Sequence, residues 1–188
     1  ARARYFLPVC DLKTLRAALK RKDLPDPFIL SGGSNILLKG DIDALVLYMD
    51  TRGKEVVWEE DNRIRLKAMG GEPWHALVLW TLDQGYGGLE NLSLIPGKTG
   101  TAPIQNIGAY GVELKDVFHS CEAIRLSDGQ LVVFDKEACG FGYRDSVFKG
   151  SAKGKYLIWS VTLELTRSHH NIRTDYVAIR AELQAMDI

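Results

Sequence analysis

The chain of 188 residues is poor in cysteine and has no excess of charge of either sign. Its three cysteines, Cys10, Cys121 and Cys139, are widely spaced and form no CxxC pair. This pattern argues against a disulfide framework and a zinc site, and it favours a reducing cytoplasm. Lys+Arg and Asp+Glu each number 24, so the charge balance gives no reason to expect nucleic acid or an anionic membrane as a partner.

Long apolar runs are also missing. No run approaches the length of a membrane span, and the opening residues ARARYFLPVC contain no apolar core of a signal peptide. The adjacent histidines His169 and His170 lie in a polar segment without carboxylate or cysteine partners, and adjacent residues do not face one another on a helix or strand. We therefore predict a cytoplasmic protein with no membrane partner and no metal site.

The remaining composition, 46% hydrophobic and 26% charged, is ordinary for a globular protein. Helical spacing predicts helices at residues 11–20, from Pro73 to about residue 82, and around residues 176–183. Strands are expected at residues 28–30, 44–49, 64–70 and 157–165. A hairpin is expected at residues 122–134, with its turn at Asp128-Gly129. An apolar segment, residues 36–38, leaves the first glycine-rich loop. This mixture with hairpins favours an α+β fold over a regular βαβ array. We place a boundary between two lobes, residues 1–50 and 51–188.

Two glycine-rich loops stand out, SGGSN at residues 31–35 and the loop at residues 96–111. Glycine lets main-chain N–H groups approach a ligand closely, and successive N–H groups can cradle an anion such as a pyrophosphate. Neither loop matches GxGxxG or a P-loop, and short glycine clusters more commonly mark turns. The residues alone therefore indicate a neutral loop pair able to hold a dinucleotide, with further donors and acceptors from Ser34, Asn35, Thr101, Gln105 and Asn106.

Three motifs together go further. SGGSN, GLENLSLIPGKTGTAPIQNIGAYGVEL and FGYRDSVFK, in this order, closely resemble the UDP-N-acetylenolpyruvoylglucosamine reductase family, also called UDP-N-acetylmuramate dehydrogenase, over residues 28–176. The resemblance implies a two-lobed α+β FAD-binding domain of the PCMH/VAO-like type. It also implies a flavoprotein oxidoreductase that uses NADPH to convert UDP-N-acetylglucosamine enolpyruvate to UDP-N-acetylmuramate for peptidoglycan, and so for cell-wall biogenesis, cell shape and cell division. We expect a monomer.

The resemblance assigns roles to individual residues. Arg144 matches the active-site arginine, whose planar guanidinium pairs with negative charge that grows on the substrate carboxylate. Asp145 either orients Arg144 or caps the turn. Tyr176 lies where the family has a tyrosine near the substrate diphosphate, although a packed helix residue is the plainer interpretation. The cofactor-binding residues implied for FAD are Gly32, Gly33, Ser34, Asn35, Ile36, Pro96, Gly97, Gly100, Thr101, Ala102, Gln105, Asn106, Ile107, Gly108, Ala109, Tyr110 and Gly111.

The sequence also departs from the family pattern. Ser31 replaces a usual glycine, and Lys98-Thr99 replaces a small residue and valine, so that Lys98 either touches a phosphate or points to water. The family's C-terminal substrate domain, with its GSFFKNP-like serine motif and a glutamate, is absent, and neither Ser146 nor Glu182 matches those motifs. We therefore expect the FAD-binding portion of a longer reductase, inactive by itself. The alternatives are a non-catalytic FAD-binding fragment and another flavin oxidoreductase of the same fold, such as a sugar or alcohol oxidase.

Overall fold

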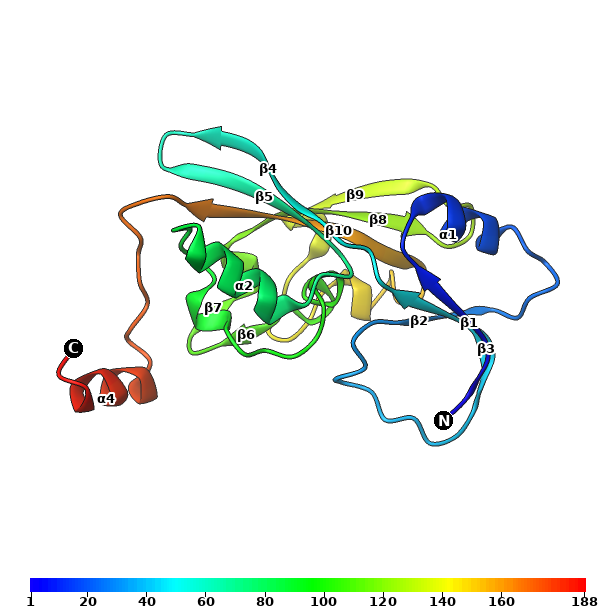
Figure 1. Ribbon diagram of the computed structural model, residues 1–188, viewed down its shortest axis with the longest axis horizontal. Helices are drawn as coiled ribbons and strands as arrows, with labels where there is room; N and C mark the ends of the chain where they lie inside the picture. The colour runs from blue at the N-terminus through cyan, green and yellow to red at the C-terminus, as the bar shows by residue number, and fades with distance from the viewer.

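The computed structural model describes every residue from Ala1 to Ile188 and contains two main β-sheets. The smaller sheet has three parallel strands in the order β1-β3-β2, formed by β1 (Ala3–Val9), β2 (Pro27–Leu30) and β3 (Ile42–Met49). It occupies one end of the elongated molecule in Figure 1. The long connection between β2 and β3 contains the first glycine-rich loop and extends away from the body.

Helix α1 (Leu12–Leu19) connects β1 to β2 and confirms the helix predicted at its position. It begins after Asp11, whose carboxylate accepts a hydrogen bond from Thr14 N at 2.7 Å and so caps a free N–H group of the first turn. Leu15 is completely buried and packs with Val9 and Leu47 of the small sheet. The same cluster contains Trp159 of the larger sheet, so the two sheets share apolar contacts.

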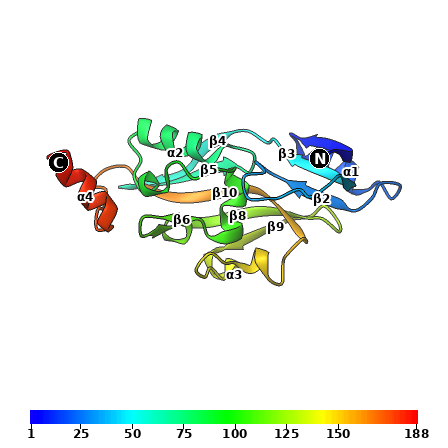
Figure 2. The same ribbon diagram turned by 90° about the horizontal axis from the view of Figure 1, so that it is seen from below.

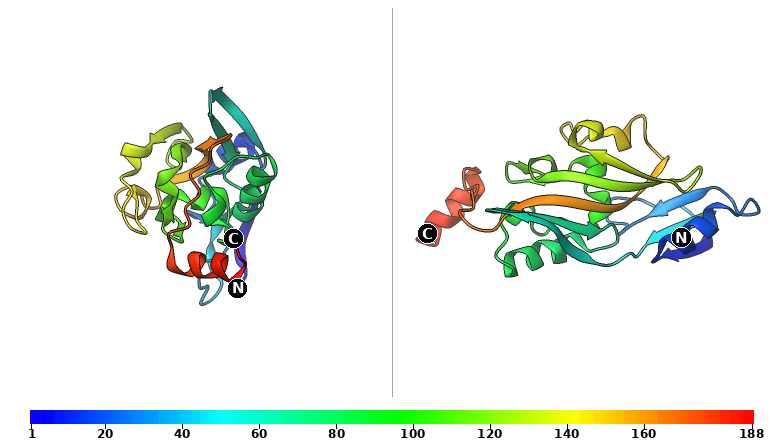
Figure 3. Two further views of the ribbon diagram at one scale, coloured as in Figure 1. Left: turned by 90° about the vertical axis from the view of Figure 1, so that its left-hand side faces the viewer. Right: turned by 90° about the horizontal axis from the view of Figure 1, so that it is seen from above.

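The larger sheet is antiparallel and has the strand order β4-β5-β10-β8-β9. Its strands are β4 (Lys54–Glu60), β5 (Arg63–Met69), β8 (Phe118–Arg125), β9 (Leu131–Asp135) and β10 (Tyr156–Thr166). The order can be followed across Figure 2 and again in the right-hand view of Figure 3, with α2 (Trp74–Asp83) near β4 and β5 and α3 (Lys136–Cys139) near β9. All four pairings are antiparallel. The pairs β4-β5 and β8-β9 join strands that are consecutive in the sequence, and β10 lies between the two pairs.

Alternation along the strands explains which face is buried. Ile64, Leu66 and Ala68 of β5 are 0% exposed, while the residues between them reach solvent, as their spacing predicts. The predicted hairpin is β8-β9, and Gly129 in its turn has φ +71°, which glycine adopts without strain. The predicted α+β class is confirmed, whereas the pattern did not reveal β1 and β4.

The second glycine-rich loop is a series of short turns on the larger sheet. The elements inside it are η2 (Thr99–Thr101), η3 (Pro103–Gln105) and β6 (Gly108–Ala109). η1 (Glu90–Leu92) precedes the loop, β7 (Val112–Glu113) and η4 (Leu114–Asp116) follow it, and η5 (Val147–Lys149) lies in the arginine motif. The main chain of the loop bonds to Gly70, Glu72 and Trp74, which connect β5 to α2, and its apolar residue Ile107 enters the main core.

Two segments lie at the margins of the fold. Ile36, Leu37 and Leu38 belong to no strand and are 43%, 82% and 40% exposed, so this apolar segment is not core. Helix α4 (Val177–Ala185) forms where a last helix was expected but has no buried residue, and Figure 1 shows it apart from the body. None of the helices has both the length and the apolar character that a membrane crossing needs.

Candidate functional site

The two glycine-rich loops face one another across a cleft with a volume of about 520 Å³. Both loops reach it although residues 36–95 separate them in the sequence. The volume falls within the usual range of small-molecule sites. The cofactor-binding residues predicted from sequence that line this cleft are Gly32, Gly33, Ser34, Asn35, Ile36, Pro96, Thr101, Ala102, Gln105 and Ile107.

A second cavity of about 490 Å³ adjoins the first at the junction of the two sheets. Ile29, Ser31, Thr101 and Ile104 line both cavities, which therefore form one groove. The second cavity is largely apolar, with aromatic and aliphatic side chains that include Phe28, Phe148, Tyr156 and Leu157. The groove thus offers main-chain groups of a glycine loop in one part and an apolar chamber in the other, an arrangement that suits a ligand with a charged centre and a flat ring.

The closeness of the loops depends on glycine. A Cβ atom at Gly32 would lie 3.3 Å from the Cα atom of Gly97, and Gly97 has φ +119°, a region that other residues rarely adopt. A hydrogen bond of 3.4 Å from Asn35 Nδ2 to Gln105 Oε1 also joins the two loops. Larger side chains at the glycines would force the walls of the groove apart.

Ser31 lines the groove at the position where the family pattern usually has glycine. Its hydroxyl oxygen is buried and has no hydrogen-bond partner. A buried polar atom without a partner costs free energy, on the order of 1–3 kcal/mol, and most such atoms in proteins are paired. Because Ser31 lines both cavities, a polar group of a ligand in the groove is a natural partner for it.

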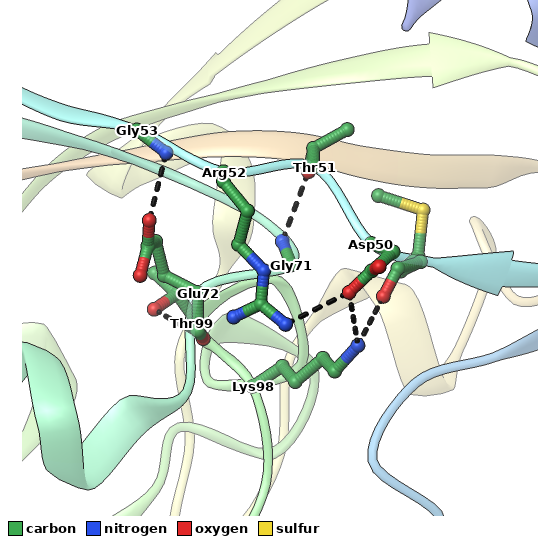
Figure 4. Close-up of polar contacts among 9 residues, drawn as sticks. Asp50, Thr51, Arg52, Gly53, Gly71, Glu72, Lys98 and Thr99 are labelled. Atoms are coloured by element: carbon green, nitrogen blue, oxygen red, sulfur yellow. Dashed lines mark hydrogen bonds and ion pairs between the residues drawn. The ribbon is translucent and has the colours of Figure 1, made fainter. Parts of the chain in front are cut away.

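The expectation that Lys98 points to water is wrong. The side chain is only 7% exposed, its Nζ donates to Met49 O and lies 3.5 Å from Asp50 Oδ1, and it sits 4.0 Å from the centre of the Tyr48 ring. Figure 4 shows Lys98 and Arg52 both directed at the Asp50 carboxylate. The bond from Arg52, and more weakly the charge of Lys98, hold the pKa of Asp50 below its usual value. Lys98 therefore ties the second loop to the end of β3.

Further bonds join the chain between the sheets to the start of α2. The Glu72 carboxylate accepts from Gly53 N at 2.7 Å, and Glu72 O accepts from Thr99 Oγ1 at 3.1 Å (Figure 4). Glu72 O also accepts from Thr99 N at 2.8 Å. Thr51 Oγ1 accepts from Gly71 N at 3.0 Å. Glu72 and Thr51 are both buried, so these bonds hold the base of the second loop in a dry environment.

Arg144 lies in a tight turn closed by a hydrogen bond of 3.0 Å from Gly142 N to Asp145 O. Its guanidinium donates to two main-chain oxygens of the second loop, Asn106 O at 3.4 Å and Gly108 O. No hydrogen bond or ion pair joins the Asp145 carboxylate to Arg144, so carbonyl oxygens and not this carboxylate orient the arginine. Only the main chain of Asp145 takes part, by closing the turn.

The other predicted cofactor-binding residues lie at or beyond the edge of the cleft. Gly100 lines the adjoining cavity, and Gly97 supports the first loop. Asn106 is 0% exposed and its side chain does not reach the cleft. Gly108 and Ala109 form β6, and Tyr110 and Gly111 form the turn to β7, beyond the cleft.

Tyr176 and the cysteines lie away from the groove. Tyr176 precedes α4 and packs edge-on against Tyr110, with ring centres 5.5 Å apart. Cys121 and Cys139 are buried in the main core, where a hydrogen bond with Cys139 and then burial raise the pKa of the Cys121 thiol. No group of three or more His, Cys, Asp or Glu side chains is arranged to hold a metal ion.

Comparison with known proteins agrees with this geometry. Residues 11–135 match the family described as "FAD binding domain". Two curated relatives named UDP-N-acetylenolpyruvoylglucosamine reductase come from Flavobacterium johnsoniae, 47% identical over 100% of this chain and 56% of the relative, and from Pseudomonas putida, 51% identical over 97% of this chain and 54% of the relative. The chain thus spans about half the length of these relatives.

Solved structures support the fold. The crystal structure of UDP-N-acetylenolpyruvylglucosamine reductase from Thermus caldophilus has a TM-score of 0.68 at 23% identity and covers 96% of this chain and 61% of that one. A solvent-stable cholesterol oxidase has a TM-score of 0.59 at 14% identity, over 88% of this chain and 35% of its own. These likenesses confirm the predicted FAD-binding fold. The chain therefore belongs to the FAD binding domain family, and its curated relatives named UDP-N-acetylenolpyruvoylglucosamine reductase confirm the resemblance that its three motifs indicated.

Proposed function

We propose that this chain holds FAD along the groove and is the cofactor-binding portion of an NADPH-dependent reductase. That enzyme converts UDP-N-acetylglucosamine enolpyruvate to UDP-N-acetylmuramate in peptidoglycan synthesis. The observation that carries the proposal is the convergence of the two glycine-rich loops on one groove, next to a buried serine hydroxyl without a partner. The names of the curated relatives support the choice of reaction.

The residues of the groove fit FAD. No main-chain hydrogen bond outside helices and strands ties residues 31–40 to the rest of the protein, so the N–H groups of the first loop remain for a pyrophosphate. The second loop differs, because the N–H groups of Thr99, Gly100 and Ala102 already bond to protein carbonyls. It would contribute side chains and apolar surface, and the apolar cavity would take a ring system. Bound FAD would supply the hydride chemistry.

Arg144 would act on the substrate in this proposal. Reduction of the enolpyruvyl double bond places negative charge on the substrate carboxylate, and a guanidinium matches that planar group with two parallel hydrogen bonds. A lysine has the charge but not the fork. In the full-length reductase, Arg144→Lys should lower kcat by about 10²–10³-fold, as the loss of a preorganised charge-stabilising donor does elsewhere.

Flavin binding is the first test. The purified chain should show visible flavin absorbance bands, or gain them when titrated with FAD, and should release FAD on denaturation. Folded protein that stays colourless after titration would overturn the proposal.

Turnover separates the remaining alternatives. NADPH oxidation that depends on the enolpyruvyl UDP-sugar is expected for the full-length reductase and not for these residues alone. Hydrogen peroxide produced on exposure of reduced protein to oxygen would indicate an oxidase instead. The same proposal has four further parts. It divides the chain into lobes at residues 1–50 and 51–188, places Tyr176 near the substrate diphosphate, locates the protein in the cytoplasm and makes it a monomer. Size-exclusion chromatography tests the monomeric state.

A further inference from the structure

Asn106 is a polar residue with no exposed surface in the middle of the second loop. Its backbone is left-handed, with φ +43° and ψ +62°, a conformation that asparagine adopts more readily than other residues with a Cβ atom. Its side chain lies outside the cleft. A buried amide is costly unless its groups are hydrogen-bonded, so its partners show what the residue does.

Both ends of the Asn106 amide are occupied. Nδ2 donates to Gly142 O at 2.9 Å, and Oδ1 accepts from Lys115 N at 2.9 Å. The side chain thus joins the second loop to the turn that contains Arg144 and to the chain that follows β7. No other residue of this size combines an amide donor, an amide acceptor and tolerance of the left-handed region: aspartate lacks the donor and glycine lacks both groups.

The main chain of Asn106 reaches the arginine itself. Asn106 O accepts from Arg144 Nη1 at 3.4 Å, and Gly108 O accepts from Nη2. A Cβ atom at Gly108 would lie 2.7 Å from Nη1 and 2.8 Å from Val112 O, so the absence of a side chain there lets the guanidinium approach. Asn106 therefore holds the arginine at two places, the turn through its side chain and the guanidinium through its carbonyl oxygen.

We propose that Asn106 is the positioning residue for Arg144 and fixes the arginine relative to the loop that lines the cofactor cleft. The proposal rests on the proposed function only in giving Arg144 a role toward substrate. The placement of the guanidinium itself is a property of the protein without cofactor. Loss of the side-chain bonds should free the turn, and the guanidinium should then leave its two carbonyl partners.

Chemical modification measures this placement directly. The chain without flavin is treated with phenylglyoxal, and mass spectrometry of its peptides gives the modification rate of Arg144 relative to Arg180 of α4. Asn106→Gly keeps the left-handed backbone but removes both side-chain bonds, and the relative rate at Arg144 should rise at least several-fold. Asn106→Asp keeps the acceptor for Lys115 N and should give an intermediate rise.

Two further variants sharpen the test. Gly108→Ala should raise the Arg144 rate although Asn106 is intact. Asn91→Ala is the matched control, because the Asn91 amide donates to Tyr110 O at 3.3 Å in the same loop but makes no bond to the arginine turn, and it should leave the rate unchanged.

A folded Asn106→Gly variant whose Arg144 reacts at the wild-type relative rate overturns the proposal. If that variant does not fold, as judged by circular dichroism, a wild-type relative rate at Arg144 in Asn106→Asp overturns it. The measurement needs no cofactor, so failure to bind FAD would refute the proposed function and leave this inference standing.

Discussion

The two glycine-rich loops have similar composition but opposite environments. In the first loop and the chain that follows it, residues 32–40 are exposed, and no main-chain bond outside helices and strands joins them to the rest of the protein. In the second, Lys98, Thr99, Gly100 and Asn106 are buried, and the main chain bonds to Gly70, Glu72 and Trp74 in the connection from β5 to α2. The difference is that one loop is held by the protein and the other is available to a ligand.

This contrast teaches what glycine does in each place. In the second loop it allows the backbone to pack against backbone, as at Gly100, where a Cβ atom would lie 3.0 Å from both Gly70 Cα and Ile158 O. In the first loop it keeps N–H groups accessible. The second loop is already held by the protein, so ligand binding need not order it, and the entropy cost of binding is lower. The proposed cofactor would have to order only the first loop.

The largest effect should come from adding one methyl group to the buried loop. Gly100→Ala should lower the free energy of unfolding by about 2–3 kcal/mol, because backbone surrounds the new Cβ atom and cannot easily move. Gly40→Ala is the matched control, since nothing lies within 4 Å of its Cβ position, and its effect should stay within about 0.5 kcal/mol. Urea unfolding checks both, and equal midpoints would contradict the contrast between the loops.

The tie at Lys98 should give the next largest effect. Lys98→Met keeps most of the apolar stem but removes the ammonium from Met49 O and Asp50, which should cost about 1–2 kcal/mol of unfolding free energy. The same substitution at the exposed Lys39, just after the first loop, should change stability by less than about 0.5 kcal/mol. A Lys98→Met protein as stable as wild type would show that the tie does not hold the second loop.

Ser31 should affect binding without lowering stability. Ser31→Ala removes the unpaired hydroxyl and should weaken FAD binding by about 1 kcal/mol, or roughly fivefold in Kd. The flavin-free variant should be at least as stable as wild type, because the cost of the buried unpaired atom is gone. Ser146→Ala should do the reverse, because Ser146 Oγ donates to Ile104 O at 2.7 Å and caps η5. Flavin titration and urea unfolding measure FAD binding and stability for both variants. If Ser31→Ala and Ser146→Ala change these two quantities in the same way, Ser31 has no separate role in binding.

The smallest effect concerns pH. The pKa of Asp50 is held below its usual value, so the ionised carboxylate stabilises the fold at a pH above its unfolded pKa of about 4, and this contribution is lost as the pH falls through the lower folded pKa. Asp50→Asn should therefore be less stable than wild type at neutral pH by under about 1 kcal/mol, since the side chain is partly exposed. Urea unfolding at falling pH should show this gap closing, and a constant gap would contradict the linkage.

Much of the fold could be predicted from the sequence. Alternation located β5 and β10, the Asp11 cap located α1, and Asp128-Gly129 located the β8-β9 turn, because each signal is local. Strands β1 and β4 were missed because their partly exposed residues give no regular alternation.

The candidate site was predicted as a set of residues and not as an arrangement. The motifs indicated both loops and Arg144, but nothing local showed that Lys98 is buried against Asp50 or that carbonyl oxygens hold the guanidinium. Nor did the sequence show that Asn106 faces the arginine turn while its neighbours Gln105 and Ile107 line the cleft.

The amino-acid order by itself determined the local conformations and the neutral, glycine-rich character of both loops, because propensities, caps and turn signals act over a few residues. Only the tertiary structure decided which amides are bonded to protein and which remain free, and which polar side chains are buried together. Those outcomes depend on contacts between residues such as Asn35 and Gln105, or Asn106 and Gly142, that are distant along the chain and meet only in the folded protein.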